Sequence, residues 1–313
     1  MSRSITRSSI VLAGMLAVGL QAAAVGAAEA QKYFPGAGAA MDAMVSAVAA
    51  GDTAALAAIL GPGSEDIVSS GDPVADKTAR EKFVEAVRAR TVIEYDGDDH
   101  VNFSVGDDEW PVPIPLVKEA AGWRFDTAAG REEILNRRIG RNELHAIAVV
   151  RGIVDAQEEY ADADPTKSGV RQYAQRILSS QGQRDGLYWP TKDGEEESPL
   201  GELVAAAVKE GYGGADSSKP APYHGYYFRL LKEQGKSAPG GAKSYLKDGK
   251  MTGGFAVVAW PADYGNSGIK TFVVNQRDLV FEKDLGADTE KVAAAITAYD
   301  PDGSWEPVEE PSS

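Results

Sequence analysis

The sequence predicts an α+β protein in which helices and an antiparallel meander come first, and a long helix with a four-stranded antiparallel sheet follows. Alanine-rich stretches with apolar residues at helical spacing lead into short alternating stretches separated by acidic turns. The same order of helix and then strands recurs in the second half of the chain. We therefore expect two domains, over residues 31–130 and 131–300.

The N-terminal unit is expected to open with three helices and to continue with four strands. The Gly51-Asp52 pair separates the first two helices, and the Asp52 side chain can cap the second. Acidic turns such as Asp96-Gly97-Asp98-Asp99 separate the strands, as hairpin loops do. The expected helices cover residues 41–50, 53–60 and 75–90, and the expected strands cover 91–95, 101–105, 110–117 and 122–125.

The C-terminal unit is expected to begin with a helix from Arg131 to Ala163. Gly140 is a candidate break in this helix, and Asn142 can cap the part that follows. Proline and acidic residues after residue 300 predict a disordered tail over 301–313. The remaining expected elements are helices over 199–209 and 289–299 and strands over 223–231, 253–260, 269–275 and 279–282.

The first thirty residues have the pattern of a secretory signal peptide. Arg3 and Arg7 precede an apolar run from Ile10 to Val25, and Ala28-Glu29-Ala30 matches the A-x-A cleavage pattern. The run is shorter and richer in small residues than the ~20 apolar residues of a membrane-spanning helix. We expect cleavage after Ala30, no membrane span afterwards, and a mature protein in the periplasm or the medium.

Composition excludes several functional classes. The 47 acidic residues outnumber the 32 basic ones, which argues against duplex nucleic acid or an anionic bilayer as the main partner. The absence of cysteine excludes disulfides, thiolate metal sites, a thiol nucleophile and a lipidated N-terminal cysteine. No metalloprotease, phosphate-loop, dinucleotide or calcium-loop motif is present, so we expect no metal and no cofactor.

Six stretches spread over nearly the whole mature chain carry a resemblance to a known family. They are SSGDPVAD from Ser69, WPVPIPLV from Trp110, GWRFDTAAGREEILNRRIG from Gly122, DGLYWP from Asp185, PYHGYYFRL from Pro222 and GGFAVVAWPADYGNSG from Gly253. These stretches resemble a bacterial exported family known as domain of unknown function 2950. The resemblance implies an exported protein without an assigned activity.

Two weaker resemblances concern the fold of each half. The N-terminal unit is similar to the cystatin-like cone of ketosteroid isomerases and polyketide cyclases, which encloses a pocket. Trp110, Trp123 and Phe125 would line it, but the sequence offers no inward carboxylate for catalysis of that type. The C-terminal unit resembles the globular head of type II secretion pseudopilins, although the chain has no pilin-type leader. Fold analogy by itself assigns no function.

Candidate binding residues gather in the C-terminal half, where aromatic side chains with polar groups are dense. They could form a platform for a glycan, peptidoglycan or a peptide, or they could fill the core of the sheet. Trp189 and Tyr264 adjoin loop-forming residues, so we expect them to be exposed. The candidates are Asp185, Tyr188, Trp189, Tyr223, His224, Tyr226, Trp260 and Tyr264.

His224 has two interpretations. On a strand it would share a face with Tyr226 and Phe228, where it could act as a general base in a pocket. Alternatively it is a core histidine whose nitrogens are satisfied by hydrogen bonds. His145 is expected to face solvent from its helix, and His100 to begin an exposed strand.

The sequence therefore favours a non-enzymatic exported protein that binds an envelope component, a glycan or a protein partner through its C-terminal aromatic residues. One alternative is an enzyme or small-ligand carrier with a pocket in the N-terminal cone or around His224. Another is a pseudopilin-like structural subunit. No catalytic residues are assigned, and the sequence predicts no oligomeric state.

Overall fold

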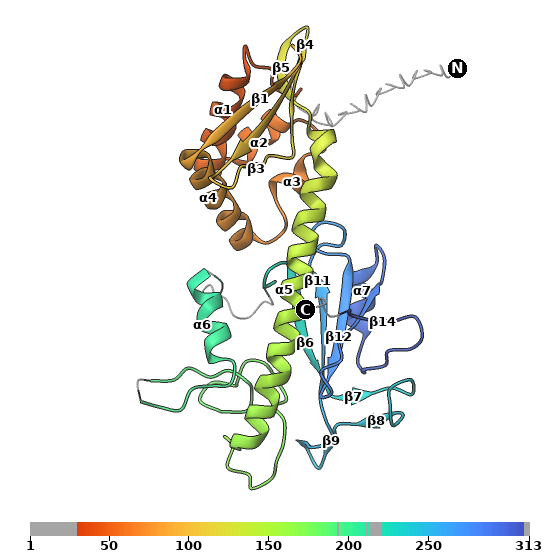
Figure 1. The fold of residues 1–313 in the computed structure, drawn as a ribbon. Helices are drawn as coiled ribbons and strands as arrows, with labels where there is room; N and C mark the ends of the chain where they lie inside the picture. Colours follow the sequence, from red (N-terminus) through yellow and green to blue (C-terminus); the bar gives the residue numbers. More distant parts are fainter. Residues whose placement is uncertain (1–29, 193, 211, 213–220, 310–313) are drawn as a thin grey trace, which may run out of the picture.

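The computed structural model describes residues 30–192, 194–210, 212 and 221–309, and these form the mixed α+β protein that the sequence predicts (Figure 1). The signal-peptide residues 1–29 lie outside the described residues. Two separate hydrophobic clusters are present, one formed by residues up to Ile134 and one by residues from Ala146 onward. The domain boundaries at 130/131 and 300/301 stay a prediction, because one long helix contributes to both clusters.

The N-terminal unit packs a short helical layer against an antiparallel sheet of order β1-β2-β4-β5, in which β3 also pairs with β2. Its helices are α1 (Ala37–Ala50), α2 (Thr53–Leu60), α3 (Glu65–Val68) and α4 (Pro73–Ala89). Its strands are β1 (Thr91–Asp96), β2 (His100–Val105), β3 (Trp110–Pro111), β4 (Leu116–Glu119) and β5 (Gly122–Phe125).

Local sequence explains these elements. Asp52 accepts a hydrogen bond of 2.9 Å from the Ala55 amide, which confirms it as the cap of α2. Phe103, Leu116 and Phe125 alternate inward from their strands and are fully buried against the helices. These packed side chains occupy the interior of the N-terminal unit, where one alternative from the sequence placed the pocket of a cone.

Helix α5 (Thr127–Ala163) is the longest element, and its 37 residues span about 55 Å. The predicted break at Gly140 is wrong, because the helix continues through it. A single glycine costs only ~1 kcal/mol in a helix, and Ile139 and Ala146 are buried on either side of it. Asn142 is not a cap either. Its amide lies in mid-helix and donates to the Ser267 carbonyl at 2.9 Å.

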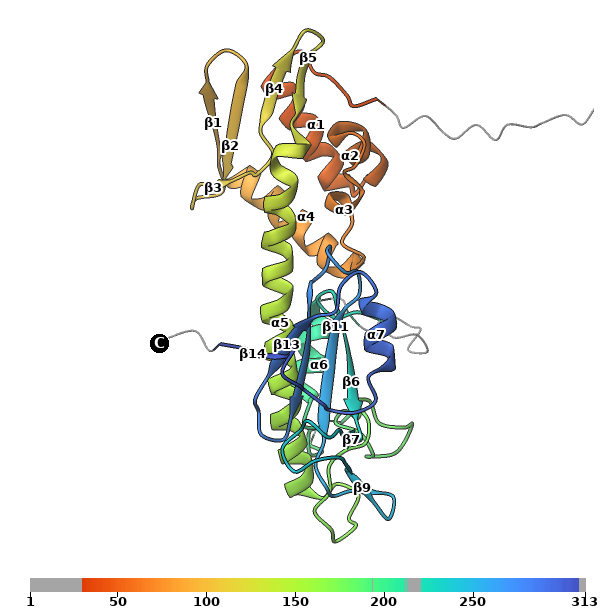
Figure 2. The same ribbon diagram turned by 90° about the vertical axis from the view of Figure 1, so that its right-hand side faces the viewer.

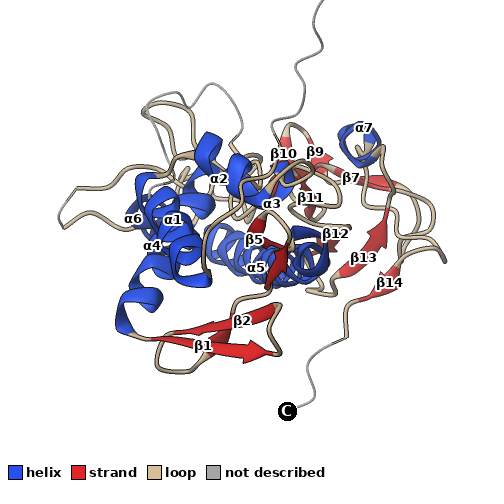
Figure 3. Cartoon of the chain, turned by 90° about the horizontal axis from the view of Figure 1, so that it is seen from above, coloured by secondary structure: helices blue, strands red, loops and turns tan. Residues whose placement is uncertain are grey.

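The C-terminal unit is an antiparallel sheet of order β14-β13-β12-β11-β6, with α5 along one face and α7 against the other (Figure 2). Seen from above, the N-terminal helices and this sheet lie on different sides of α5 (Figure 3). The main elements are α6 (Gly201–Glu210), β6 (Tyr226–Leu231), β11 (Ala256–Pro261), β12 (Lys270–Asn275), β13 (Phe281–Asp284), α7 (Thr289–Ala295) and β14 (Glu306–Pro307). Two small hairpins pair β7 (Glu233–Gln234) with β8 (Lys243–Ser244), and β9 (Leu246–Lys247) with β10 (Lys250–Met251).

Part of the predicted disordered tail is ordered. β14 pairs with β13, and the side chains of Trp305 and Val308 pack against the C-terminal hydrophobic cluster. Two large apolar side chains near the sheet edge provide the burial that holds this segment. Residues 310–313 lie outside the described residues.

A buried carboxylate joins the two units. Asp72 is only 1% exposed, and one of its oxygens caps α4 by accepting from the amides of Val74 and Ala75 at 3.1 and 3.0 Å. The other oxygen accepts from the Tyr212 hydroxyl at 2.8 Å and from the Gly225 amide at 3.0 Å. Asp72 is thus both a helix cap and the acceptor for two donors of the C-terminal unit.

Arg138 of α5 forms a second connection between the units. Its guanidinium donates to the carbonyls of Asp66 and Ile67 in α3, and to the amide oxygen of Asn266 in the β11–β12 loop. Asn266 in turn donates to the Ser69 carbonyl at 3.2 Å. The α3–α4 segment, α5 and the β11–β12 loop are therefore held together by polar contacts.

Replacing Asp72 by alanine is expected to lower the free energy of unfolding by about 3–7 kcal/mol. The change removes a helix cap worth ~1 kcal/mol and leaves the Tyr212 hydroxyl and Gly225 amide without their acceptor, at ~1–3 kcal/mol each. Asp52→Ala is the matched control, because Asp52 caps a helix without contacting the other unit. Urea denaturation should show a loss of only ~1 kcal/mol for the control; equal losses would contradict the role of Asp72 between the units.

Candidate functional site

The eight residues predicted to bind a ligand do not share one surface. Asp185, Tyr188 and Trp189 lie near the C-terminal end of α5, where Tyr160 contacts Trp189. Tyr223 and His224 lie beside His145, nearer its middle. The helical rise between positions 145 and 160 places these two groups about 22 Å apart. The eight residues therefore fall into separate groups along α5.

His224 lies in a tight turn before β6, so its prediction as a strand residue is wrong. Tyr223 and Tyr226 exchange two backbone hydrogen bonds, of 2.8 and 3.1 Å, around the pair His224-Gly225. Both residues of that pair have positive φ, 47° and 76°, as a type I′ turn requires. A side chain at position 225 would come within 2.9 Å of Asn142 and Ser267, so this turn packs tightly on α5 and on the β11–β12 loop.

The turn places His224 in a cluster of rings at the junction of the units. The His224 Nε2 atom lies 2.9 Å from an oxygen of Glu210 at the end of α6. The rings of His145 and Tyr223 lie 4.3 and 4.4 Å from the His224 ring, centroid to centroid, and Tyr212 lies at 5.4 Å. The sequence analysis missed Glu210 and Tyr212, and it missed the contact of His145.

The imidazole–carboxylate pair has one feature of a general base, because a carboxylate can orient the ring. Catalysis also needs a reacting group and a space for substrate. Among the described residues, no hydroxyl, thiol or amine side chain is hydrogen-bonded to the His224 ring. Two cavities of the described chain, of about 630 and 290 Å³, are lined by other residues and do not include His224.

Two of the predicted binding residues belong to the hydrophobic core. Tyr226 is fully buried, and its hydroxyl donates to the Lys270 carbonyl at 2.9 Å. Trp189 is 6% exposed, which corrects the expectation that it faces solvent. Its indole packs edge-on against Tyr160 and lies beneath the Arg184 guanidinium, so neighbouring prolines and acidic residues did not bring it to the surface.

Trp260 and Tyr264 are half-buried and lie apart from the ring cluster. The Arg229 guanidinium lies 5.3 Å from the Trp260 ring centroid, and Tyr227 packs beside that ring at 5.6 Å. The Tyr264 hydroxyl donates to Asp284 at 3.3 Å, and this bond raises the pKa of Tyr264. Both side chains are engaged within the C-terminal unit.

Asp185 lies in the wall of a cavity of about 290 Å³ at the C-terminal end of α5. Tyr160 at its base is buried, Tyr173 and Asp185 are half-buried, and Thr166 and Arg176 are exposed at the rim. The cavity is lined by Tyr160, Thr166, Gln172, Tyr173, Gln175, Arg176 and Asp185.

The chain around this cavity is held by side-chain hydrogen bonds to backbone. The buried Gln157 of α5 accepts from the Ala174 amide at 2.8 Å and donates to the Ala174 carbonyl at 2.9 Å. Asp164, which ends α5 with a φ of 44°, accepts from the amides of Ser168 and Gly169. These bonds fix the two segments that carry Thr166, Gln172 and Gln175.

The charges of the cavity balance. An Asp185 oxygen lies 3.5 Å from the Arg176 guanidinium. Burial works against ionisation of Asp185, but hydrogen bonds from the Ser180 amide and hydroxyl outweigh it and lower the pKa of this carboxyl. The cavity thus presents an ionised but paired acid and base.

Metal sites and membrane helices were sought over the described residues. No group of three metal-ligating acidic or histidine side chains is present among them. No helix in this part of the chain is both long and apolar enough to cross a membrane.

Comparison with known proteins yields one match. A family described as "Protein of unknown function (DUF2950)" matches residues 31–308, nearly the whole chain. No curated protein and no solved structure matches the chain. The cystatin-like and pseudopilin-like resemblances are therefore not confirmed.

Two of the histidines, His145 and His100, are expected to titrate at different pH. Partial burial, and then the nearby His224, lower the pKa of His145, whereas the hydrogen bond to the Asp99 carboxylate raises the pKa of His100. Because the unfolded chain binds the His145 proton more readily, this residue costs stability as the pH falls from about 6.5 through its folded pKa. Imidazole NMR titration should place the His145 midpoint below that of His100.

The His224→Gln variant tests the second cause. Removing the neighbouring imidazole should move the His145 midpoint up and leave His100 unchanged, since His100 lies in the β1–β2 hairpin. An unchanged His145 midpoint would show that burial alone lowers its pKa.

Proposed function

The chain belongs to the DUF2950 family of proteins of unknown function, and we propose that it is an exported protein that binds a neutral polyhydroxylated ligand such as a glycan unit. The observation that carries this proposal is the 290 Å³ cavity beside the C-terminal end of α5. Export is supported by the signal-peptide pattern of residues 1–30.

The lining of the cavity selects the class of ligand. Each of its seven side chains carries a hydroxyl, amide or charged group, and none is aliphatic. Apolar ligands would leave those groups without hydrogen bonds, which costs free energy. Because Arg176 and Asp185 face each other, neither an anion nor a cation is strongly favoured. A ligand with many neutral hydroxyl groups satisfies such a lining best.

One tyrosine adds a surface for the apolar side of a sugar. Tyr173 is half-buried in the cavity wall, and its ring can pack against the C–H groups of a sugar while its hydroxyl stays hydrogen-bonded, whereas Tyr160 is only 2% exposed and supports the wall from behind. The Tyr160 hydroxyl donates to the Arg184 carbonyl at 2.7 Å, and that of Tyr173 donates to Glu158 at 3.1 Å. Both rings are therefore held in place before a ligand arrives.

Envelope polysaccharides are the glycans that an exported bacterial protein meets. This proposal keeps the binding role expected from the sequence, but it moves the site from an aromatic platform to the cavity of Asp185. Acid–base chemistry at His224 is the second candidate, supported by the 2.9 Å contact with Glu210. We place it second because neither the 630 Å³ nor the 290 Å³ cavity includes His224.

Binding should be lost when the cavity is filled. Thr166→Trp places a large ring at the exposed rim, and Gln175→Leu removes an amide while keeping side-chain volume. Isothermal titration with soluble peptidoglycan fragments and other envelope oligosaccharides should show no binding to the first variant. Binding to the second should be about tenfold weaker, as expected for lost hydrogen bonds.

Tyr264→Ala and Trp260→Ala are controls, since both aromatic residues lie outside the cavity. Each control should bind like the wild type. An unchanged melting temperature of Thr166→Trp and Gln175→Leu would show that these cavity variants are folded. Loss of binding in the controls with full binding in the cavity variants would assign the ligand to the aromatic residues instead. A ligand converted to product, with activity lost in His224→Gln, would support the enzymatic alternative.

A further inference from the structure

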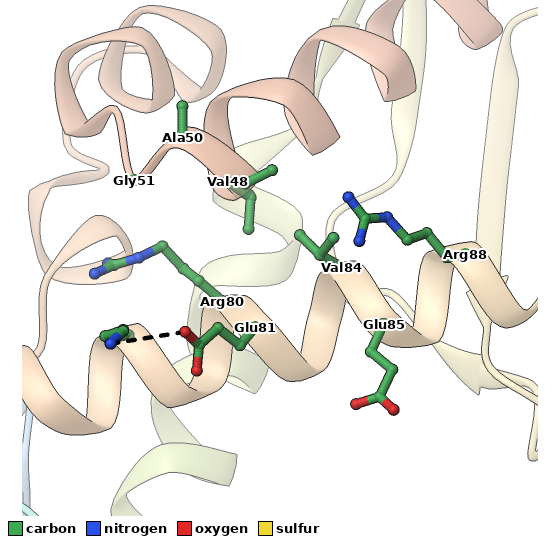
Figure 4. Close-up of a pocket in the computed structure, with 10 residues that line it drawn as sticks. Val48, Ala50, Gly51, Arg80, Glu81, Val84, Glu85 and Arg88 are labelled. Atoms are coloured by element: carbon green, nitrogen blue, oxygen red, sulfur yellow. Dashed lines mark ion pairs between the residues drawn. The ribbon is translucent and has the colours of Figure 1, made fainter. Parts of the chain in front are cut away.

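A groove of about 630 Å³ lies in the N-terminal unit. It lies between the C-terminal end of α1, from Val48 to Gly51, and the side of α4 that faces α1 (Figure 4). Val48 and Val84 face each other across it, while Arg80 and Arg88 extend from α4 on either side of Val84. None of the eight candidate binding residues discussed above contributes to this groove.

Its two arginines have no acidic partner. Within the described chain, neither Arg80 nor Arg88 makes an ion pair or a side-chain hydrogen bond, whereas the nearby Arg90 lies 2.7 Å from Glu109. Lys77 differs, because its ammonium lies 3.8 Å from Glu81. Glu81 and Glu85 also line the groove, but among the described residues neither pairs with Arg80 or Arg88, and Glu85 projects away from α1 in Figure 4. The groove therefore carries two arginines without a carboxylate partner, in a protein whose net charge is −15.

The end of α1 supplies hydrogen-bond acceptors. The Gly51 amide donates to the carbonyls of Ala47 and Val48. The last carbonyls of a helix have no partner within it, and no hydrogen bond between described residues reaches those of Ala49 and Ala50. A ligand with N–H donors as well as negative charges satisfies both walls of the groove.

Spacing further restricts the ligand. Arg80, Val84 and Arg88 follow one another at i, i+4 and i+8, which places the two arginine Cα atoms about 12 Å apart on one side of α4. In an extended peptide, residues i and i+4 point the same way and lie about 13 Å apart, with residue i+2 between them. Two carboxylates at i and i+4 and an apolar side chain at i+2 therefore match Arg80, Val84 and Arg88.

We propose that the α1–α4 groove binds an extended acidic segment of a partner polypeptide with this alternating pattern. The carboxylates pair with Arg80 and Arg88, the central apolar side chain packs on Val48 and Val84, and backbone N–H groups donate to the end of α1. Guanidinium–carboxylate pairs supply both orientation and affinity. This inference stands independently of glycan binding at the other end of the molecule.

The experiment uses a fluorescent peptide of sequence Gly-Ser-Glu-Ser-Leu-Ser-Glu-Ser-Gly and the mature chain. Fluorescence anisotropy should show binding that weakens as salt increases, and no binding of the peptide in which both Glu are replaced by Lys. Arg80→Ala and Arg88→Ala should each weaken binding about tenfold, as for one lost charge-assisted hydrogen-bonded pair. Lys77→Ala, which removes a charge already paired with Glu81, should change the affinity less than twofold.

Other results would overturn the proposal. Equal affinity of the Glu peptide for the wild type and for the folded double variant R80A/R88A would place binding elsewhere. If the peptide does not bind, but inorganic phosphate raises the melting temperature of the wild type and not that of R80A/R88A, the groove is a simple anion site and the proposal is wrong. Dimers that dissociate in R80A/R88A would assign it to a second copy of this chain.

Discussion

The arrangement of the whole molecule depends on the burial of one carboxylate. Asp72 follows the α3–α4 turn, yet the four hydrogen bonds of its carboxylate engage the start of α4, the Tyr212 hydroxyl and the turn before β6. A buried charge is stable only when its acceptor positions are filled. Each segment therefore has to be in place for the others to be satisfied, and the two hydrophobic clusters are held in a defined relation.

The long helix α5 runs through this junction and sets the distance between the regions on either side of it. It begins beside the N-terminal sheet, passes the polar junction at Arg138 and Asn142, and ends at the cavity of Asp185 (Figure 1). The three places with chemical interest are consequently separated: the α1–α4 groove, the histidine cluster and the polar cavity. Because they share no residues, a ligand at one leaves the others open, and each can be altered alone.

Periodicity and composition predicted most of the elements because those depend on neighbouring residues. Helix α2, the cap at Asp52 and the order of the strands all follow from local signals. The family was also identifiable from the sequence. Gly140 shows the limit of such reasoning, since a helix-weakening residue is tolerated where packing on both sides continues.

The candidate site was only partly predictable, because its members come from distant segments. Asp185 was identified, but Gln172 and Gln175 carry no motif, and Glu210 reaches His224 only through the folding of α6 toward β6. Trp189 shows the opposite error. Its loop-forming neighbours in the sequence suggested exposure, whereas the core beside α5 takes up its large side chain. Burial is set by the partner segment, which sequence spacing does not contain.

The last strand has a consequence for association between molecules. β14 covers the free side of β13 with only two residues, and the second of them, Pro307, has no N–H to offer a further strand. At the neighbouring position, Glu306 pairs in register with Glu282 and brings two negative charges together, and the Lys270 ammonium lies 3.1 Å from Glu282. A sheet that ends in this way resists extension by a neighbouring copy, which protects a protein without disulfides from edge-to-edge aggregation.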